Sequence, residues 1–291
     1  MSIEKIILGT AQLGLNYGVN NREGKPTETE ALRILHEAHK QGIRYLDTAA
    51  AYGTSEELIG KYHKNSGNTF SVITKFHGTN EQDVEKQISV ALDKLNTKRL
   101  DGLLYHSYRN FKDSPDLLRK LTEEVKANRI GKIGVSVYEN AEIEDLLNYP
   151  EVEIIQAPFN LLDNANRRGE VLQRAKEEGK IIHTRSVFLQ GLFFSELNNL
   201  SDQLLPLRGY LKQLKDLAIE NNITLNEIAL AYSLHQPFID GVLIGVDNEI
   251  QLKKNIVSVS KGVIDKELMG KINEIEVTEN IAHLLNPVNW K

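Results

Sequence analysis

The sequence contains no cysteine, which excludes a disulfide framework and thiolate metal sites. Long apolar runs are also missing, because no stretch approaches the roughly 20 residues that a membrane-spanning helix needs. Cations are not in excess, since 35 Lys and Arg stand against 40 Asp and Glu and no basic block occurs. This balance argues against nucleic acid or a membrane surface as a partner. Met1–Lys5 lacks the apolar core of a secretion signal, and we expect a cytoplasmic protein.

What is present is an ordinary globular composition, with 41% hydrophobic and 26% charged residues among 291. Single α/β barrels commonly reach roughly 250 residues, so this length is compatible with one domain. No linker, low-complexity tract or change in composition divides the chain. We therefore expect a single domain over residues 1–291. His36 and His39 lack a third ligand, so we expect no metal site.

Eight short apolar runs are spaced along the chain. Most are continuous rather than alternating, which is typical of parallel strands that are buried on both faces. The expected strands are Ile6–Ala11, Arg44–Thr48, Phe70–Phe76, Leu100–His106, Lys132–Val137, Ile154–Pro158, Lys180–Val187 and Gly241–Val246.

Amphipathic segments lie between these runs. Thr27 and Glu30 form a capping-box pair, apolar residues then recur at helical spacing, and Gly42 ends the segment. The alternation of strand and helix, repeated eight times, predicts a closed (β/α)8 TIM barrel. Further helical stripes run through Val84–Leu95, Leu207–Ala218, Leu225–Leu234 and Leu252–Val259.

An open, doubly wound sheet is the alternative fold. Such a sheet usually carries a glycine-rich phosphate loop after its first strand. Gly9–Gly14 lacks the GxGxxG spacing, and this disfavours a Rossmann module.

Two connections are longer than a barrel needs. Residues 14–25 are polar and rich in Asn and Gly, and residues 189–205 contain Phe193, Phe194 and several Asn. Both follow predicted strands, so both should lie on the C-terminal face of the barrel, where active sites are built. Tolerated surface insertions are the alternative interpretation.

Four ionisable side chains fall at the ends of three consecutive predicted strands: Asp47 with Tyr52, then Lys75, then His106. A buried Lys75 needs a counter-ion, and Asp47 is the natural partner. A neighbouring ammonium stabilises the phenolate form of Tyr52, which could then pass a proton to and from an oxygen that gains negative charge. A neutral His106 could hydrogen-bond the same oxygen.

Each residue alone has an ordinary structural explanation. A strand-end Asp is often a helix cap, Tyr52 could be a core residue with a solvated hydroxyl, and Lys75 could extend its ammonium to the surface. The combination of the four on one rim is what favours a proton-transfer site.

The pattern DTAxxYG at residues 47–53, together with Lys75 and His106, resembles the Asp-Tyr-Lys-His tetrad of the aldo-keto reductases. The likeness covers almost the whole chain. It implies a (β/α)8 barrel in which Tyr52 is the general acid/base. It further implies that Lys75 and Asp47 tune Tyr52 and that His106 orients the substrate carbonyl.

The resemblance also implies a nicotinamide cofactor bound in extended form. Ser136 and Gln156 match residues that contact its carboxamide, and Ser186 matches a phosphate contact. Arg185 occupies a position that is usually aromatic and that stacks on the nicotinamide ring. Val137 stands where the family usually has Asn. The implied cofactor contacts are Gly9, Thr10, Asp47, Ser136, Gln156, Arg185, Ser186, Gly245, Gln251 and Asn255.

The segment after the last strand departs most from the family. Many members of the family bind the 2′-phosphate of NADPH and the adenine through side chains in this segment, several of them cationic. Of the corresponding positions in this chain, only Asn255 has the same residue type as the family. Lys253 or Lys254 could substitute for the missing cations, whereas Asp247 could hydrogen-bond a free ribose hydroxyl of NADH. NADPH is the expected cofactor and NADH the alternative.

The resemblance implies reduction of an aldehyde or ketone to an alcohol, with hydride from nicotinamide C4 and a proton from Tyr52. Bacterial members found among sugar and cell-surface polysaccharide enzymes look most similar, so a keto-sugar is one candidate substrate. Tyr17, Tyr52 and His106 are the expected substrate contacts, and Trp290 is a further candidate for the wall of the site.

Two other functions stay open. A Schiff-base aldolase would use Lys75 as its nucleophile, although it leaves Tyr52, Ser136 and Gln156 without a joint purpose. A regulatory subunit that binds the cofactor as a sensor is the second, and the intact tetrad speaks against it.

Overall fold

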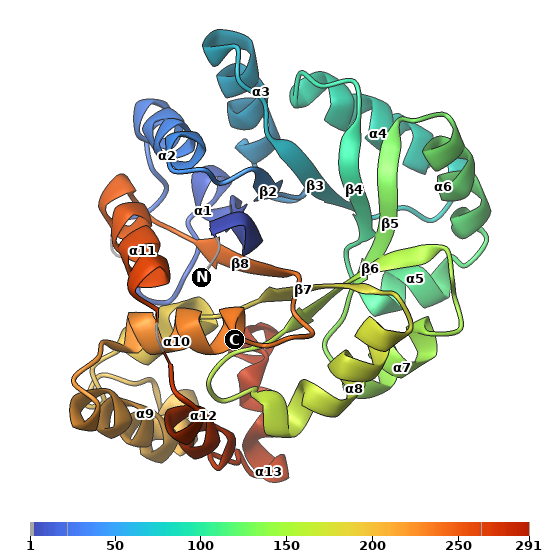
Figure 1. The fold of residues 1–291 in the computed structure, drawn as a ribbon. Helices are drawn as coiled ribbons and strands as arrows, with labels where there is room; N and C mark the ends of the chain where they lie inside the picture. Colours follow the sequence, from blue (N-terminus) through green and yellow to red (C-terminus); the bar gives the residue numbers. More distant parts are fainter. Residues whose placement is uncertain (1–2, 22, 263, 291) are drawn as a thin grey trace.

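A computed structural model describes residues 3–21, 23–262 and 264–290. Eight parallel strands close into a barrel in the sequential order β1 to β8, with β1 paired to β8 (Figure 1). The closed (β/α)8 barrel expected from the sequence is thereby confirmed, and the open sheet is wrong. The strands are β1 Ile6–Gly9, β2 Tyr45–Asp47, β3 Ser71–Phe76, β4 Leu100–Tyr105, β5 Ile130–Ser136, β6 Val152–Pro158, β7 Ile181–Arg185 and β8 Gly241–Gly245.

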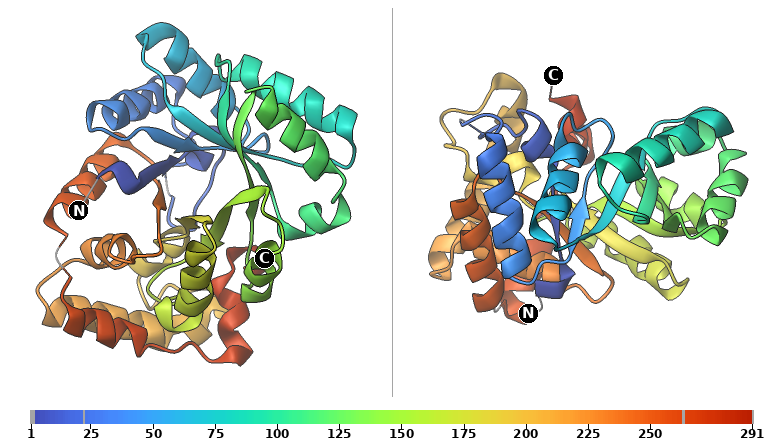
Figure 2. Two further views of the ribbon diagram at one scale, coloured as in Figure 1. Left: turned by 45° about the vertical axis from the view of Figure 1, so that its right-hand side comes forward. Right: turned by 90° about the horizontal axis from the view of Figure 1, so that it is seen from above.

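The helices form the outer layer around this barrel, as the three ribbon views show (Figures 1 and 2). They are α1 Ala11–Gly14, α2 Glu28–Lys40, α3 Ser55–Ser66, α4 Glu81–Lys94, α5 Tyr108–Asp113, α6 Leu117–Lys126, α7 Asn140–Leu146, α8 Ala165–Glu177, α9 Arg208–Glu220, α10 Leu225–Leu234, α11 Glu249–Lys261, α12 Lys266–Asn273 and α13 Glu279–Ala282. The 3-10 helices are η1 Ile3–Lys5, η2 Leu189–Phe194, η3 Asp202–Leu207, η4 His283–Leu285 and η5 Pro287–Asn289.

Local sequence signals account for several of these boundaries. The capping box of Thr27 and Glu30 starts α2, with both reciprocal hydrogen bonds formed. The prediction that β1 extends to Ala11 is wrong, because the strand ends at Gly9 and α1 begins at Ala11. Thr10 turns the chain at this point by donating both its N–H and its hydroxyl to the carbonyl oxygen of Asp47, each over 2.9 Å.

The apolar core has two parts. The larger part lies between the barrel and the surrounding helices. The smaller part consists of Ile73, Leu104 and Ile154, with Ile181 packed against it, and these residues come from strands β3, β4, β6 and β7. Such side chains fill a barrel interior, so polar groups that lie beyond them at the strand ends sit on a closed floor.

The long connection after β7 is partly helical rather than irregular. It contains η2 and η3, and within η2 the φ angles of Leu189, Gln190 and Gly191 are 47°, 53° and 86°. Left-handed backbone at two non-glycine residues stores strain, which neighbouring contacts must hold in place.

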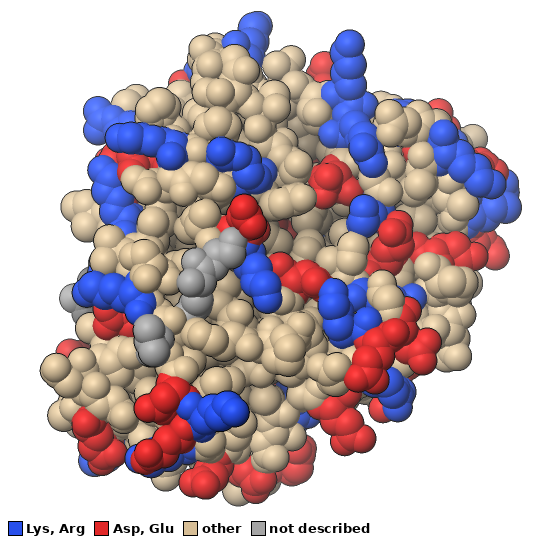
Figure 3. Space-filling model, viewed as in Figure 1, with Lys and Arg blue, Asp and Glu red and all other residues tan. Residues whose placement is uncertain are grey.

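Charges of both signs are interspersed on the face shown in Figure 3, with uncharged surface between them. Among the described residues, no helix is long and apolar enough to cross a membrane.

Candidate active site

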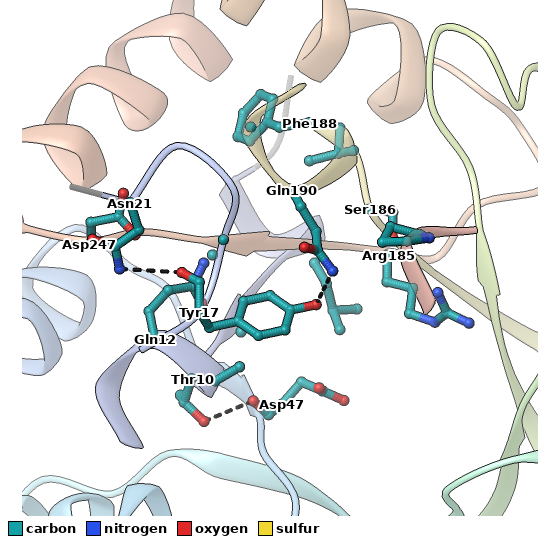
Figure 4. A pocket seen from close by; sticks show the side chains of 18 of the residues that line it. Thr10, Gln12, Tyr17, Asn21, Asp47, Arg185, Ser186, Phe188, Gln190 and Asp247 are labelled. Carbon is teal, nitrogen blue, oxygen red and sulfur yellow. Dashed lines mark hydrogen bonds between the residues drawn. The ribbon is translucent and has the colours of Figure 1, made fainter. Parts of the chain in front are cut away.

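A cavity of about 750 Å³ opens at the C-terminal ends of the strands. Both long connections contribute to it, through Tyr17 on one side and Gln190 on the other (Figure 4). Gln190 Nε2 donates a hydrogen bond of 2.9 Å to the Tyr17 hydroxyl, and Asn20 donates one of 3.0 Å to Ser195. The two connections therefore meet over the cavity.

Asp47 organises the floor of this cavity from the end of β2. One carboxylate oxygen lies 2.5 Å from Lys75 Nζ, and the other accepts a 2.8 Å hydrogen bond from Gln156 Nε2. Lys75 also donates to the carbonyl oxygen of Thr48 over 3.1 Å. The exposed fractions of Asp47, Lys75 and Gln156 are 3%, 2% and 0%. At this burial the ion pair is shielded from solvent screening.

The ion pair keeps Lys75 charged. Burial is the largest influence and would lower the pKa of this ammonium, but the adjacent Asp47 carboxylate and Tyr52 together outweigh it, and the pKa is raised above its ordinary value. Lys75 is thus a fixed positive charge, and its Nζ lies 5.3 Å from the centre of the Tyr52 ring.

Tyr52 is placed by a tight turn after β2. Ser55 donates its backbone N–H to the Tyr52 carbonyl over 3.0 Å. The Ser55 hydroxyl, buried below the turn, donates to Thr10 Oγ1 over 2.7 Å and lies 3.0 Å from Thr48 Oγ1. Gly53 follows with φ 56°, a left-handed conformation that favours glycine. These contacts fix the backbone on which the phenol stands.

His106 faces Tyr52 across the site, directly after β4. The rings of Tyr52 and His106 pack edge to face with centres 6.1 Å apart. The imidazole of His77 stacks on that of His106, with ring centres 4.5 Å apart. Burial, the Lys75 charge and the His77 and Arg185 side chains lower the pKa of His106 to about 3. His106 is therefore a neutral imidazole at physiological pH, able to donate one hydrogen bond.

The side-chain carbonyl oxygen of Gln156 is a buried hydrogen-bond acceptor on the cavity floor. Gln156 Oε1 has no hydrogen-bond partner among the described residues, although its own Nε2 is held by Asp47. Ser136, at the end of β5 and paired in register with Gln156, also lines the cavity. An oriented carbonyl beside a hydroxyl suits a primary amide, whose N–H₂ and C=O would meet both.

Arg185 crosses the top of β6 from the end of β7. Its guanidinium donates a 2.8 Å hydrogen bond to the carbonyl of Val137 and stacks 4.1 Å above the ring of Tyr138. Both partners lie just after β5. Arg185 thus extends over the part of the floor that Gln156 occupies, and Figure 4 shows it at the edge of the cavity.

The far end of the cavity lies at β8 and the start of α11. Asp247 accepts a 3.0 Å hydrogen bond from Gln251 there, and burial raises the pKa of Asp247, with Glu23 adding to the effect. Lys253 pairs with Glu249 at 2.5 Å, whereas Lys254 lines the cavity. The two lysines are therefore not equivalent at this site.

The cavity brings together all fourteen residues that the sequence singled out as catalytic, cofactor or substrate contacts. Trp290 is not among the lining residues, and its indole N–H instead donates to the carbonyl of Leu284 over 2.7 Å. Phe193 is core, whereas Phe194 lines the cavity. Further lining residues, none of them named individually as a contact from the sequence, include Gln12, Asn20, Asn21, Tyr138, Gln190, Asn226 and Val288.

Most of these additional residues follow no strand-end pattern. Asn20 and Asn21 belong to a connection that the sequence placed near the site, and its polar composition was a usable signal. Tyr138 lies two residues past the end of β5, and only the contact with Arg185 reveals its position.

A barrel with a buried ion pair, a phenol and a neutral imidazole at its C-terminal rim has the groups that a proton-transfer site needs, on the face where barrel enzymes carry their active sites. The model of the Aldo/keto reductase family matches residues 5–277. The chain belongs to this family, as its sequence resemblance indicated.

Known proteins of the family resemble the chain along nearly their whole length. An NADH-specific methylglyoxal reductase of Escherichia coli is 22% identical, covering 91% of this chain and 92% of that protein. An L-galactose dehydrogenase of Arabidopsis thaliana is 23% identical, with 90% and 86% covered. The holo structure of an aldo-keto reductase from Bacillus halodurans superimposes with a TM-score of 0.79 at 22% identity, covering 95% and 94%.

Proposed function

We propose that this protein reduces an aldehyde or ketone to an alcohol with a reduced nicotinamide cofactor, and that Tyr52 donates the proton. The observation that supports this most strongly is the buried pair of Asp47 and Lys75, with Lys75 Nζ 5.3 Å from the Tyr52 ring centre. A paired, permanently charged ammonium beside a phenol has a clear chemical use, because it stabilises the phenolate that remains after proton donation.

The residues present fit a nicotinamide group. The unpartnered Gln156 Oε1 would accept a hydrogen bond from the carboxamide N–H₂, and the Ser136 hydroxyl would bind the same amide. Asp47 holds Gln156 in the orientation that this requires. When bound, the reduced nicotinamide supplies the hydride that goes to the carbonyl carbon.

The protein's own groups would handle the carbonyl oxygen. Tyr52 would hydrogen-bond the oxygen and give up its phenolic proton as negative charge develops there. His106, neutral because burial and nearby positive charges lower its pKa to about 3, would donate a second hydrogen bond and orient the carbonyl. Lys75 would stay protonated throughout, with Asp47 as its counter-ion.

The state of Lys75 disfavours the Schiff-base alternative. A nucleophilic lysine must lose its proton, usually through burial or a neighbouring cation that lowers its pKa. Here the Asp47 carboxylate at 2.5 Å raises the pKa of Lys75 instead. Borohydride treatment in the presence of a carbonyl substrate should leave Lys75 unmodified, and a covalent adduct at this residue would support the aldolase mechanism.

The carboxylates at the β8 end lead us to propose NADH in place of the NADPH expected from the sequence, although Lys254 also lines the cavity there. Asp247 lines the cavity there, and Glu23 lies next to it through a 3.1 Å hydrogen bond with Asn248. A 2′-phosphate near these two carboxylates would be repelled, whereas a free ribose hydroxyl could donate to Asp247. The NADH specificity of the related methylglyoxal reductase is in line with this preference.

Comparison of kcat/KM for the two cofactors tests this preference. We expect a higher value with NADH, and Asp247→Asn should narrow the difference because it removes one repelling charge. Lys254→Met tests the opposite assignment, NADPH binding through a cation, because Lys254 is the one lysine of the pair 253–254 that lines the cavity. A loss of NADPH use in Lys254→Met, from a wild type that prefers NADPH, would contradict the assignment.

The two long connections contribute polar side chains to the cavity, beside Phe188 and Phe194. The side chains of Tyr17, Asn20, Asn21 and Gln190 line it, and they can both donate and accept hydrogen bonds. Such a lining suits a hydroxylated carbonyl compound, and a sugar-derived aldehyde or ketone fits that description. The L-galactose dehydrogenase among the relatives supports a sugar as one substrate class.

The decisive experiment is a cofactor-oxidation screen against simple aldehydes, keto-sugars and nucleotide-linked sugars. The proposal expects turnover with at least one hydroxylated carbonyl compound. Tight cofactor binding without oxidation on any carbonyl compound would instead support a cofactor-binding regulatory subunit.

A further inference from the structure

Arg185 is a positive charge in the cavity without a carboxylate partner. Among the described residues, no Asp or Glu oxygen forms an ion pair with its guanidinium. The charge of Lys75, in contrast, is balanced by the carboxylate of Asp47. The partners of Arg185 are an uncharged carbonyl, that of Val137 at 2.8 Å, and the face of the Tyr138 ring at 4.1 Å. These contacts orient the guanidinium but leave its full charge uncompensated.

The position of that charge follows from the strand register. Arg185 pairs with Pro158 on β6, two residues beyond Gln156, and its side chain reaches back to the carbonyl of Val137. The Val137 N–H in turn donates to the Gln156 carbonyl over 2.9 Å. The guanidinium is therefore held beside the strand segment that presents the unpartnered Gln156 amide oxygen.

The charge also reaches the reacting groups. Arg185 is one of the charges that lower the pKa of His106, and it opposes the protonation of Lys75. A ring held by the Gln156 side chain and close enough to pass a hydride to a carbonyl between Tyr52 and His106 must lie within the field of this guanidinium. The oxidised nicotinamide ring carries a positive charge and the reduced ring carries none.

We propose that Arg185 makes the site select the reduced cofactor over the oxidised one by charge repulsion. The inference rests on the proposed function, because it requires a nicotinamide on the Gln156 floor. Like charges a few ångströms apart in a partly buried site repel more strongly than in bulk water, so the oxidised form alone is penalised. The selection would favour binding of the hydride donor and release of its oxidised product, which suits a reductase.

A competing role for Arg185 is direct binding of an anion, either the pyrophosphate of the cofactor or an acidic group of the substrate. The two roles make different predictions for binding. A phosphate contact would strengthen the binding of the oxidised and the reduced cofactor equally. A contact to an acidic substrate would change the affinity for neither form of the cofactor. Charge repulsion acts on the oxidised state only.

The test measures Kd for NADH and NAD⁺ by calorimetry in wild type, Arg185→Met and Arg185→Lys, without any carbonyl substrate. We expect wild type to bind NADH at least about tenfold more tightly than NAD⁺. Arg185→Met should reduce that ratio at least about fivefold, mainly by tightening NAD⁺ binding. Arg185→Lys keeps a charge and should retain most of the ratio. Thermal unfolding of each variant checks that the fold is kept, and Arg185→Gln replaces Arg185→Met if the latter fails to fold.

The outcomes separate this inference from the proposed function. An equal loss of affinity for both forms in Arg185→Met, or an unchanged ratio, would overturn the charge selection while leaving the reductase proposal intact. Failure of wild type to bind either form of NADH or NADPH would overturn both. If NADPH is the tighter ligand, the same ratio is measured with NADPH and NADP⁺.

Discussion

A Cβ atom added to Gly14 would lie 1.7 Å from the carbonyl oxygen of Tyr52. Gly53, the next residue along the turn, approaches Gly14 from the other side, since its own added Cβ would lie 2.5 Å from the Gly14 carbonyl oxygen. The segment after β1 and the turn after β2 thus touch through two backbones with no room for a side chain. This contact positions the phenol that the proposed mechanism requires.

Gly14→Ala should displace Tyr52 and lower kcat by at least about tenfold, because a backbone atom cannot move aside as a flexible side chain would. Overpacking of this kind also costs roughly 1–3 kcal/mol of unfolding free energy. Steady-state kinetics and urea unfolding measure the two effects. Gly270→Ala is the control, since an added Cβ there meets nothing within 4 Å. Equal kinetics for the two variants would show that the contact does not position Tyr52.

The effects of replacing Asp47 and Lys75 on the unfolding free energy should be coupled, so that removing both charges costs less than removing one. Removing both should not restore catalysis. Asp47→Asn leaves a buried ammonium without a counter-ion, so we expect a loss of roughly 3–5 kcal/mol of unfolding free energy. Asp47→Asn combined with Lys75→Met removes both charges and should recover most of that loss. Carbonyl reduction should remain impaired in all these variants. Additive losses in the double variant would contradict the coupling.

The same pair predicts a pH dependence at the alkaline end. Because the folded pKa of Lys75 is raised, its contribution to stability is fully present below the unfolded value of roughly 10.5. That contribution is lost as the pH rises through the folded pKa. In Lys75→Met, the unfolding free energy measured with denaturant should therefore fall less steeply at alkaline pH than in wild type. An unchanged fall would show that the Lys75 charge does not cause it.

His106 should remain uncharged under mildly acidic conditions. Burial, Lys75, His77 and Arg185 lower its pKa from 6.5 to about 3, so the stability it contributes is present above about 6.5 and is lost as the pH falls toward 3. Imidazole signals assigned by comparison with His106→Asn should show no titration between pH 8 and 5. A midpoint near 6.5 would contradict a neutral orienting role.

The barrel could be predicted from the sequence because each strand is a compact apolar run and the helices between them have recognisable starts. Thr27 and Glu30 are an example, since their spacing alone specifies the first turn of α2. Three of the four site groups could be predicted for the same reason: Asp47, Lys75 and His106 lie within one residue of the ends of consecutive strands, which a barrel brings to one rim.

Contacts between distant loops could not be predicted in this way. The hydrogen bond between Tyr17 and Gln190 joins residues 173 positions apart, and Gln190 adopts a left-handed backbone that no glycine signals. The stacking of Arg185 on Tyr138 likewise depends on a side chain crossing a neighbouring strand. Periodicity and spacing describe elements, whereas these contacts depend on how loops fold over the completed barrel.

Proton donation by Tyr52 is tested by the Tyr52→Phe variant, which keeps the ring and removes the acidic hydroxyl. The measurement is the single-turnover rate of cofactor oxidation with a saturating carbonyl substrate, together with the cofactor Kd from fluorescence quenching. We expect a rate lower by about 10²–10⁴-fold, the range for loss of a positioned acid, with the cofactor Kd nearly unchanged. A variant that reduces the carbonyl at the wild-type rate would contradict proton donation by Tyr52.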